Sequence, residues 1–444
     1  MQHRHVVTRI VDGALPSRLL LWLLAMGLAV CSGCGGGPSL VAAPNLYTHG
    51  GQHPYDNVPE GLQNNRVELF YATDRVPEIQ EDGTIHYGYG RSQSLAVGNC
   101  TVTIGEDLSW LELVEASTSE QRTKDLPLAV QRIDEQVRFP STSTPQIKVG
   151  NEYVEDPTVK EAAGQARSRA MALLEKRIAA SERKEVYIFV HGYNNSFEAA
   201  AFRMAQLWHF MGREGVPVIY TWPAGRGGVL RGYTYDRESS EFTIHHFRQF
   251  LKAIAETPGL EKVHLIAHSR GTDVAVTGLR ELHLETSGTG EDTRSRMKLG
   301  NLVLAAPDLD WEVAQQRISA ERILQVPEHV AFYLSKEDRA IGIAGWLFAS
   351  VQRIGRLAIG DLSEAQRKAV EDFPEMDIIN VTVDVDFVGH GYFINNPAVL
   401  SDLILILRDG KDAGAEHGRP LARDEGTFWQ LRNGYPYQEV AGGE

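Results

Sequence analysis

Cysteine is scarce in this chain. The 444 residues contain only three cysteines, and two of them, Cys31 and Cys34, lie close together near the N-terminus. Only Cys100 remains for the rest of the chain, which excludes a disulfide framework and a cysteine zinc site there. Cys100 is therefore predicted to be a small core residue.

Clusters of basic residues and long apolar segments are also missing. The formal net charge is -14 at pH 7, and lysine and arginine are scattered along the chain. Because phosphate backbones are bound by clustered cations, we expect no nucleic-acid partner. The apolar run at residues 19–30 is shorter than the roughly 20 residues of a membrane-spanning helix.

The N-terminus has the composition of a secretory signal. Three arginines precede the apolar run at 19–30, and small residues follow it. A basic stretch, a short apolar stretch and small residues are typical of a signal peptide that is removed on export. The sequence therefore predicts an exported protein with residues 1–33 as its signal peptide.

The small residues carry a candidate lipidation site. The sequence SGC at 32–34 resembles the lipobox of bacterial lipoproteins, although Cys31 stands where that pattern prefers leucine. We favour Cys34 over Cys31 as the processed residue, because bulky Val30 adjoins the competing cleavage point. Acyl chains on Cys34 would anchor the protein to a membrane of the bacterial cell envelope, with 34–65 as a flexible tether.

Residues 66–444 are predicted to form the folded domain. Short strands are expected at 67–71 and 101–104, loops over 115–160, and a helix over 159–181. Further on, six apolar runs alternate with amphipathic segments, at 186–190, 216–220, 263–266, 302–305, 330–334 and 379–383. That alternation predicts an α/β fold with a mostly parallel central sheet and helices on both faces.

The third of these runs ends at a candidate nucleophile. In the sequence AHSRG at 267–271, Ser269 stands between an apolar run and a helix-like segment. A serine on a sharp strand-to-helix turn needs small residues two positions before and after it. Ala267 and Gly271 meet that requirement, with alanine in place of the usual first glycine.

A serine nucleophile needs a base and a carboxylate, which follow it in the order acid, then histidine. Asp338 lies directly after the fifth apolar run, and His390 lies between two glycines after the sixth. These two residues are the predicted acid and base. Asp308, after the fourth run, is the rival acid.

Two backbone N–H groups are predicted to bind the oxyanion of the tetrahedral intermediate. One belongs to Arg270, directly after the nucleophile, and the other to Tyr193, in the loop after the first apolar run. His191 and His268 lie beside this site, and we interpret both as packing or supporting residues. No metal or cofactor is expected.

Several motifs together resemble an uncharacterised bacterial branch of the alpha/beta-hydrolase superfamily. They are FYATDR at 70–75, VHGYNN at 190–195, YTWP at 220–223, YDRES at 235–239, AHSRG at 267–271, APD at 306–308, RIGR at 353–356 and GHGYF at 389–393. The resemblance implies an alpha/beta-hydrolase fold and a triad of Ser269, Asp338 and His390. Arg270, where methionine is common, and Gly391, where serine is usual, are departures that bear on substrate preference.

The function that follows is a serine hydrolase acting on a carboxylic ester or thioester, a small-molecule or lipid substrate. An amide substrate and a catalytically silent binding domain in the cell envelope are the alternatives. Arg270 could attract an anionic substrate group or pair with Asp273 or Asp308. Residues 342–368 could form a lid or a helix packed on the body. Substrate identity and oligomeric state are left open by the sequence.

Overall fold

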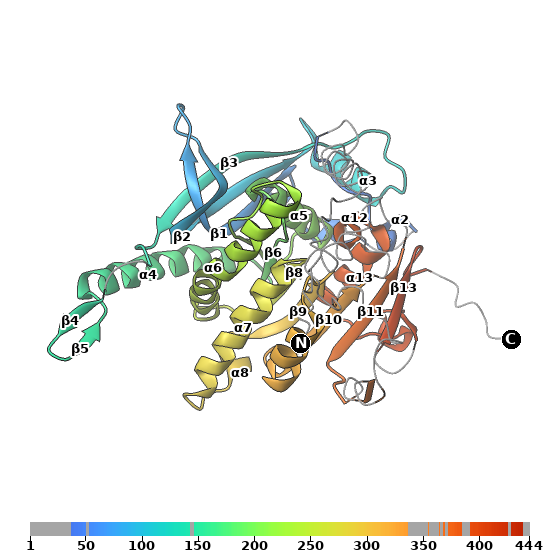
Figure 1. Ribbon diagram of the computed structural model, residues 1–444. Coiled ribbons are helices and arrows are strands. Elements are labelled where there is room, and N and C mark those ends of the chain that lie inside the picture. The colour runs from blue at the N-terminus through green and yellow to red at the C-terminus, as the bar shows by residue number, and fades with distance from the viewer. Residues whose placement is uncertain are drawn as a thin grey trace, which may run out of the picture.

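The computed structural model describes residues 37–49, 53–142, 146–335, 354, 364, 367–368, 372–383, 391–424 and 428–437 (Figure 1). Its strands are β1 (Arg66–Ile79), β2 (Ile85–Ile104), β3 (Leu128–Arg138), β4 (Ile147–Val149), β5 (Glu152–Val154), β6 (Glu185–Val190), β7 (Val216–Thr221), β8 (Lys262–His268), β9 (Leu299–Ala305), β10 (His329–Leu334), β11 (Met376–Thr382), β12 (Ala422–Arg423) and β13 (Phe428–Arg432). Each of the six predicted central strands is present.

A single large sheet organises the described residues. Its strand order is β12-β13-β11-β10-β9-β8-β6-β7-β1-β2-β3. All neighbouring strands from β13 to β1 are parallel, whereas β12, β2 and β3 add antiparallel edges. The carboxyl ends of β6, β8, β9 and β10 therefore meet at one edge of the sheet, where the loops that carry ligands or catalytic groups are placed in such folds.

Helices cover both faces of this sheet. They are α2 (Asn45–Thr48), α3 (Trp110–Thr118), α4 (Pro157–Ala180), α5 (Phe197–Phe210), α6 (Val229–Ala255), α7 (Gly271–Ser287), α8 (Thr293–Met297), α9 (Trp311–Ala314), α12 (Tyr392–Asn395) and α13 (Pro397–Leu407). Short helical turns lie at Pro54–Asn57, Glu60–Leu62, Gln315–Ala320, Ile323–Gln325 and Ala415–His417. The alpha/beta-hydrolase architecture predicted from the sequence is confirmed.

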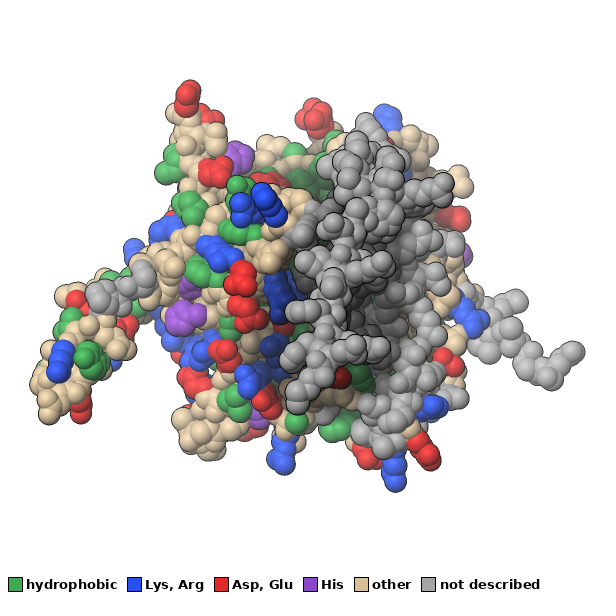
Figure 2. Space-filling view, viewed as in Figure 1, with side chains coloured by type: hydrophobic (Ala, Val, Ile, Leu, Met, Phe, Trp, Pro, Cys, Tyr) green, Lys and Arg blue, Asp and Glu red, His purple; other side chains and the backbone are tan. Residues whose placement is uncertain are grey.

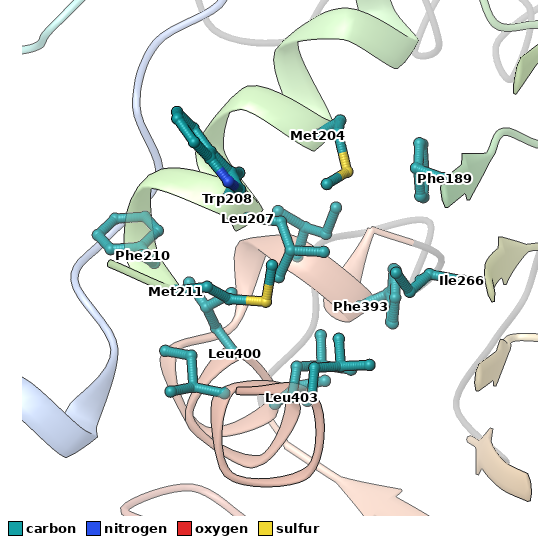
Figure 3. Close-up of a cluster of buried hydrophobic side chains, with 14 of the residues drawn as sticks. Phe189, Met204, Leu207, Trp208, Phe210, Met211, Ile266, Phe393, Leu400 and Leu403 are labelled. Atoms are coloured by element: carbon teal, nitrogen blue, oxygen red, sulfur yellow. The ribbon is translucent and has the colours of Figure 1, made fainter. Parts of the chain in front are cut away.

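Alternating side chains of β6 supply two separate cores. Tyr187 and Phe189 pack with α5 and α13 on one face, and Val186, Ile188 and Val190 pack with α6 and α7 on the other. Successive strand residues point to opposite faces, so a strand buried on both sides needs a continuous apolar run. Figure 3 shows the first core, where Phe189 and Ile266 face Met204 and Leu207 of α5 and Leu403 of α13.

The predicted loops over 115–160 are wrong for most of their length. This stretch contains the end of α3, the edge strand β3 and the small hairpin of β4 and β5, which Figure 1 shows projecting from the body with α4. The capping box between Ser109 and Glu112 is a local signal for α3. In β3 most side chains are exposed or half-buried, so its sequence shows only a weak alternation of apolar and polar residues.

The flexible tether predicted for 34–65 also differs from the structure of its described part. Leu40, Tyr47 and Tyr55 are buried in the core beside α5. The Tyr47 hydroxyl donates to the Phe210 carbonyl at 2.5 Å. Isolated aromatic anchors in a stretch rich in glycine and proline give no periodic signal, so the folded domain begins earlier than the sequence indicated.

Charged side chains of both signs are interspersed on the face that Figure 2 shows. Between α6 and α7, Arg248 pairs with Glu281 at 2.8 Å and with Glu285 at 2.7 Å. Such exposed pairs each contribute at most about 1 kcal/mol. Within the described ranges, none of the helices has the length and apolar character needed to cross a membrane.

Candidate active site

Ser269 occupies the turn between β8 and α7. Its backbone φ is +54°, in the left-handed region that L-residues avoid. Its N–H donates to Ala305 O at 2.9 Å, and its carbonyl accepts from the Thr272 hydroxyl at 2.7 Å. Backbone strain held by surrounding bonds is characteristic of functional sites, and this turn has the geometry of a nucleophile elbow.

Two glycines allow the chain to close around Ser269. A Cβ on Gly271 would lie 2.4 Å from the carbonyl oxygen of His191, so α7 approaches β6 only because this position lacks a side chain. A Cβ on Gly192 would lie 2.6 Å from Ser269 Cβ and 3.1 Å from Ser269 Oγ. The loop after β6 is therefore in direct contact with the candidate nucleophile. Ala267, the small residue two positions before Ser269, is fully buried at the end of β8.

The two predicted oxyanion donors flank this contact. Tyr193 follows Gly192, and Arg270 follows Ser269. Within the part of the chain that the structure describes, neither backbone N–H donates to a backbone oxygen. Both donors are therefore compatible with the role predicted for them, the binding of a negatively charged oxygen next to Ser269.

His191 is committed to holding its own loop. Its Nε2 accepts a hydrogen bond from the Trp222 N–H at 3.1 Å, so the proton resides on Nδ1, which donates to the Gly192 carbonyl at 2.9 Å. Burial, reinforced by the Arg75 cation, lowers the pKa of His191 well below its usual value. A histidine with both nitrogens engaged in this way is a supporting residue and not a base.

Buried histidines should make the protein less stable in mild acid. Burial lowers the pKa of His191 and of His209 well below the usual value, and nearby arginines act in the same direction. Both stay neutral when folded, whereas the unfolded chain takes up their protons below about pH 6.5. The unfolding free energy should therefore fall by about 1.4 kcal/mol per histidine between about pH 7.5 and 5.5.

Urea unfolding at these two pH values measures this loss. In His209→Gln the fall between the two pH values should be smaller by about 1.4 kcal/mol than in the unsubstituted protein. An identical fall in both proteins would mean that His209 does not contribute to the acid sensitivity.

Arg270 is paired inside the protein. Its guanidinium lies 2.6 Å from the Asp273 carboxylate and donates from Nε to the Ser240 hydroxyl at 3.2 Å. Burial alone would lower its pKa, but Asp273 and Asp308 raise it above the usual value. Of the two roles considered for the Arg270 side chain, pairing with Asp273 is the one observed.

Asp308, the rival acid, lies against the backbone of the candidate nucleophile. Its N–H is 3.3 Å from Ser269 O, and its Oδ2 accepts from the Tyr233 hydroxyl at 2.9 Å. The side chain is buried. Asp308 is therefore close to Ser269, with one carboxylate oxygen bound to a tyrosine of α6.

The other predicted site residues lie outside the described residues. These are Asp338, His390 and Cys34, together with all but four residues of the candidate lid at 342–368. One of those four, Ile354, is buried and donates its N–H to Leu309 O at 3.0 Å, so this point of the segment contacts the body.

The residues that follow His390 in the sequence are described, and they lie at the same edge as Ser269. Phe393 stacks on His268 with 5.7 Å between ring centroids and an interplanar angle of 13°. The Tyr392 hydroxyl donates to Tyr333 O, near the end of β10, at 3.1 Å. The GHGYF motif thus ends beside the residue that precedes Ser269.

Sequence reasoning missed the residues that fix the loop after β6. Arg75 on β1 and Asp236 on α6 are both buried and bind this loop. They belong to the FYATDR and YDRES motifs, which pointed to the family but gave no role to either side chain. Their partners come from distant parts of the chain, so no local pattern could reveal them.

Comparison with models of protein families agrees with the fold described above. The model of a family described as alpha/beta hydrolase of unknown function (DUF900) matches residues 166–408, more than half of the chain. No significant match is found among curated proteins. One similar solved structure is that of a protein from Agrobacterium vitis S4 designated a hydrolase, at 15% identity and a TM-score of 0.26, covering 53% of this chain and 88% of the other.

Proposed function

Because this chain belongs to the family of alpha/beta hydrolases of unknown function, we propose that it is a serine hydrolase that cleaves a carboxylic ester or thioester. The observation that carries the proposal is Ser269, held at a φ of +54° at the end of β8 with Gly192 packed against it. A serine on a strained turn, in contact with a loop that can supply an oxyanion donor, is the arrangement that acyl transfer requires.

The proposed reaction proceeds through an acyl-enzyme. Ser269 Oγ attacks the acyl carbon while His390 takes the hydroxyl proton, and the carbonyl electron pair moves onto oxygen, where the N–H groups of Tyr193 and Arg270 bind it. Collapse of this intermediate breaks the bond to the alcohol or thiol, which leaves with the proton from His390. Water then attacks the acyl-enzyme with His390 as base, which releases the carboxylic acid and restores Ser269.

Asp338 has a supporting role in this scheme. It would accept a hydrogen bond from the imidazole of His390, hold the ring in the reactive tautomer and stabilise the imidazolium that forms in each half-reaction. The nucleophile, the base and the oxyanion donors are all groups of this chain, so the proposed steps need no cofactor.

The proposal is tested by a panel of nitrophenyl esters, thioesters and anilides with acyl chains of increasing length. We expect turnover of esters and thioesters that is saturable and depends on chain length. Failure of the purified protein to cleave any acyl substrate would favour a silent binding domain, and preferential cleavage of anilides would make the chain an amide hydrolase.

A further inference from the structure

Arg75 is a buried cation that joins several segments around the candidate site. Its side chain is almost fully buried. The guanidinium donates to the Thr221 hydroxyl at 2.8 Å, Gly88 O at 2.8 Å, Ala224 O at 2.9 Å and Asn195 O at 2.8 Å, and Nη2 lies 3.3 Å from His191 Nε2. One side chain of β1 therefore binds β2, the end of β7, the stretch after β7 and the loop after β6.

The partners of Arg75 are unusual for a buried arginine. Each hydrogen bond goes to a carbonyl, a hydroxyl or an imidazole, and within the described ranges no carboxylate lies within ion-pair distance. Burial lowers its pKa to about 10, so it remains a cation at neutral pH. Nearby carboxylates, Asp74 first among them, oppose this shift without contacting the guanidinium. Burying a charge without a direct ion pair is costly, and here the cation is stabilised by hydrogen bonds that join several segments.

Asp236 holds the same loop from the opposite side. Its Oδ2 accepts the Asn194 N–H at 2.8 Å, and both oxygens accept the Gly225 N–H, at 3.2 and 3.3 Å. Asn194 has a φ of +53°, so this carboxylate stabilises a left-handed turn directly after Tyr193. Burial raises the pKa of Asp236, and the backbone N–H groups bound to it oppose that shift.

Tyr193 lies between these two attachments. Before it, the His191 ring is held by Trp222 and Arg75, and after it, Asn194 is held by Asp236 and Asn195 O by Arg75. The Asn195 amide adds a bond to Tyr193 O at 2.8 Å. The direction of the Tyr193 N–H is thus set by contacts on both sides of the peptide unit that carries it.

We propose that Arg75 and Asp236 are positioning residues that aim the Tyr193 N–H at the oxyanion formed on Ser269, an inference that rests on the proposed function. Oxyanion donors act through preorganisation, and loss of one typically lowers kcat by about 100- to 1000-fold. A donor that is present but poorly oriented still contributes part of this rate enhancement, so the variants should lose less kcat than removal of the donor would cost. The substrate in its ground state gains little from such a donor, so KM should change far less than kcat.

The test uses Asp236→Asn and Arg75→Lys, with Glu185→Gln as the matched control. Asparagine presents an N–H group where one carboxylate oxygen now accepts, and lysine keeps the charge but loses the planar fork. We expect kcat to fall by about 10-fold in Asp236→Asn and about 100-fold in Arg75→Lys, with KM within about twofold. Glu185 accepts from Tyr187 at the opposite end of β6, so its variant should keep kcat.

Two further measurements distinguish a loss of Tyr193 N–H orientation from a loss of overall stability. The inhibition constant of a trifluoromethyl ketone, which forms a tetrahedral oxyanion on serine, should rise by the same factor as kcat/KM falls. Hydrogen exchange of a peptide covering residues 191–195 should accelerate, while peptides from other parts of the sheet keep their rates.

The outcomes are distinct. An active unsubstituted enzyme whose two variants fold and keep kcat would overturn this inference and leave the proposed function intact. Variants that lose kcat only together with a fall in melting temperature and faster exchange throughout the chain would also overturn it. If the unsubstituted protein cleaved no acyl substrate, the proposed function would fail, and this inference with it.

Discussion

Ser269→Ala should lower ester hydrolysis by about a million-fold, to the level left by substrate binding and oxyanion donors alone. The hydroxyl is the only protein group in the proposed mechanism that bonds to the acyl carbon, and alanine has no nucleophilic atom to replace it. Alanine keeps the same Cβ and the same backbone strain, so the fold should be retained. Steady-state kinetics on the best ester of the panel measure the loss.

Ser240→Ala is the matched control for this experiment. Ser240 is also a buried serine near the site, and its hydroxyl accepts from Arg270 Nε at 3.2 Å. Its loss removes this bond and the one that the hydroxyl donates to Arg237 O, but no reacting atom, so the rate should stay within about tenfold. Retention of full activity in Ser269→Ala, with the melting temperature unchanged, would exclude Ser269 as the nucleophile.

The second large effect concerns the acid of the triad. Asp338→Asn should lower kcat by about ten-thousand-fold, because an amide in that place favours the wrong imidazole tautomer and cannot stabilise the imidazolium. Asp308→Asn should have an effect of less than about tenfold, because one oxygen of that carboxylate is bound to the Tyr233 hydroxyl and an amide oxygen can keep that bond. Parallel kinetics on the two variants compare them directly.

The reverse ranking would identify Asp308 as the acid. Tyr233→Phe then provides a second check, because it removes the hydrogen bond that the Tyr233 hydroxyl donates to Asp308 without changing the charge of the carboxylate. If Asp338 is the acid, this variant should keep most of the activity. A large loss of kcat in Tyr233→Phe would instead connect Asp308 to the chemistry.

The sequence predicts those parts of the fold that depend on residues close together in the chain. Each central strand is an apolar run because it is buried on both faces, and the elbow is visible because Ala267 and Gly271 are small at fixed spacing from Ser269. These features depend on residues a few positions apart. The pair His191 and Gly192 is a weak signal alone, and the loop after β6 was proposed to carry an oxyanion donor only together with the serine, acid and histidine in the expected order.

Features that depend on distant contacts were missed. Val41 and Tyr47 attach the predicted tether to α5 through hydrogen bonds to Gln206 and Phe210, more than 150 residues away, which composition cannot reveal. Arg75 and Asp236 stood in recognised motifs, but their shared target, the loop around Tyr193, appears only once β1 and α6 are placed beside it. The pairing of Arg270 with Asp273 could be weighed from the sequence but not decided.

Covalent labelling tests the central claim most directly, that Ser269 is the nucleophile. A fluorophosphonate reacts with an activated serine to form a stable adduct, and mass spectrometry of the digested protein locates it. We predict one adduct, on the peptide that contains Ser269, and no adduct in Ser269→Ala. An adduct on another serine in place of Ser269, or ester hydrolysis that continues unchanged after Ser269 is fully labelled, would contradict the proposal.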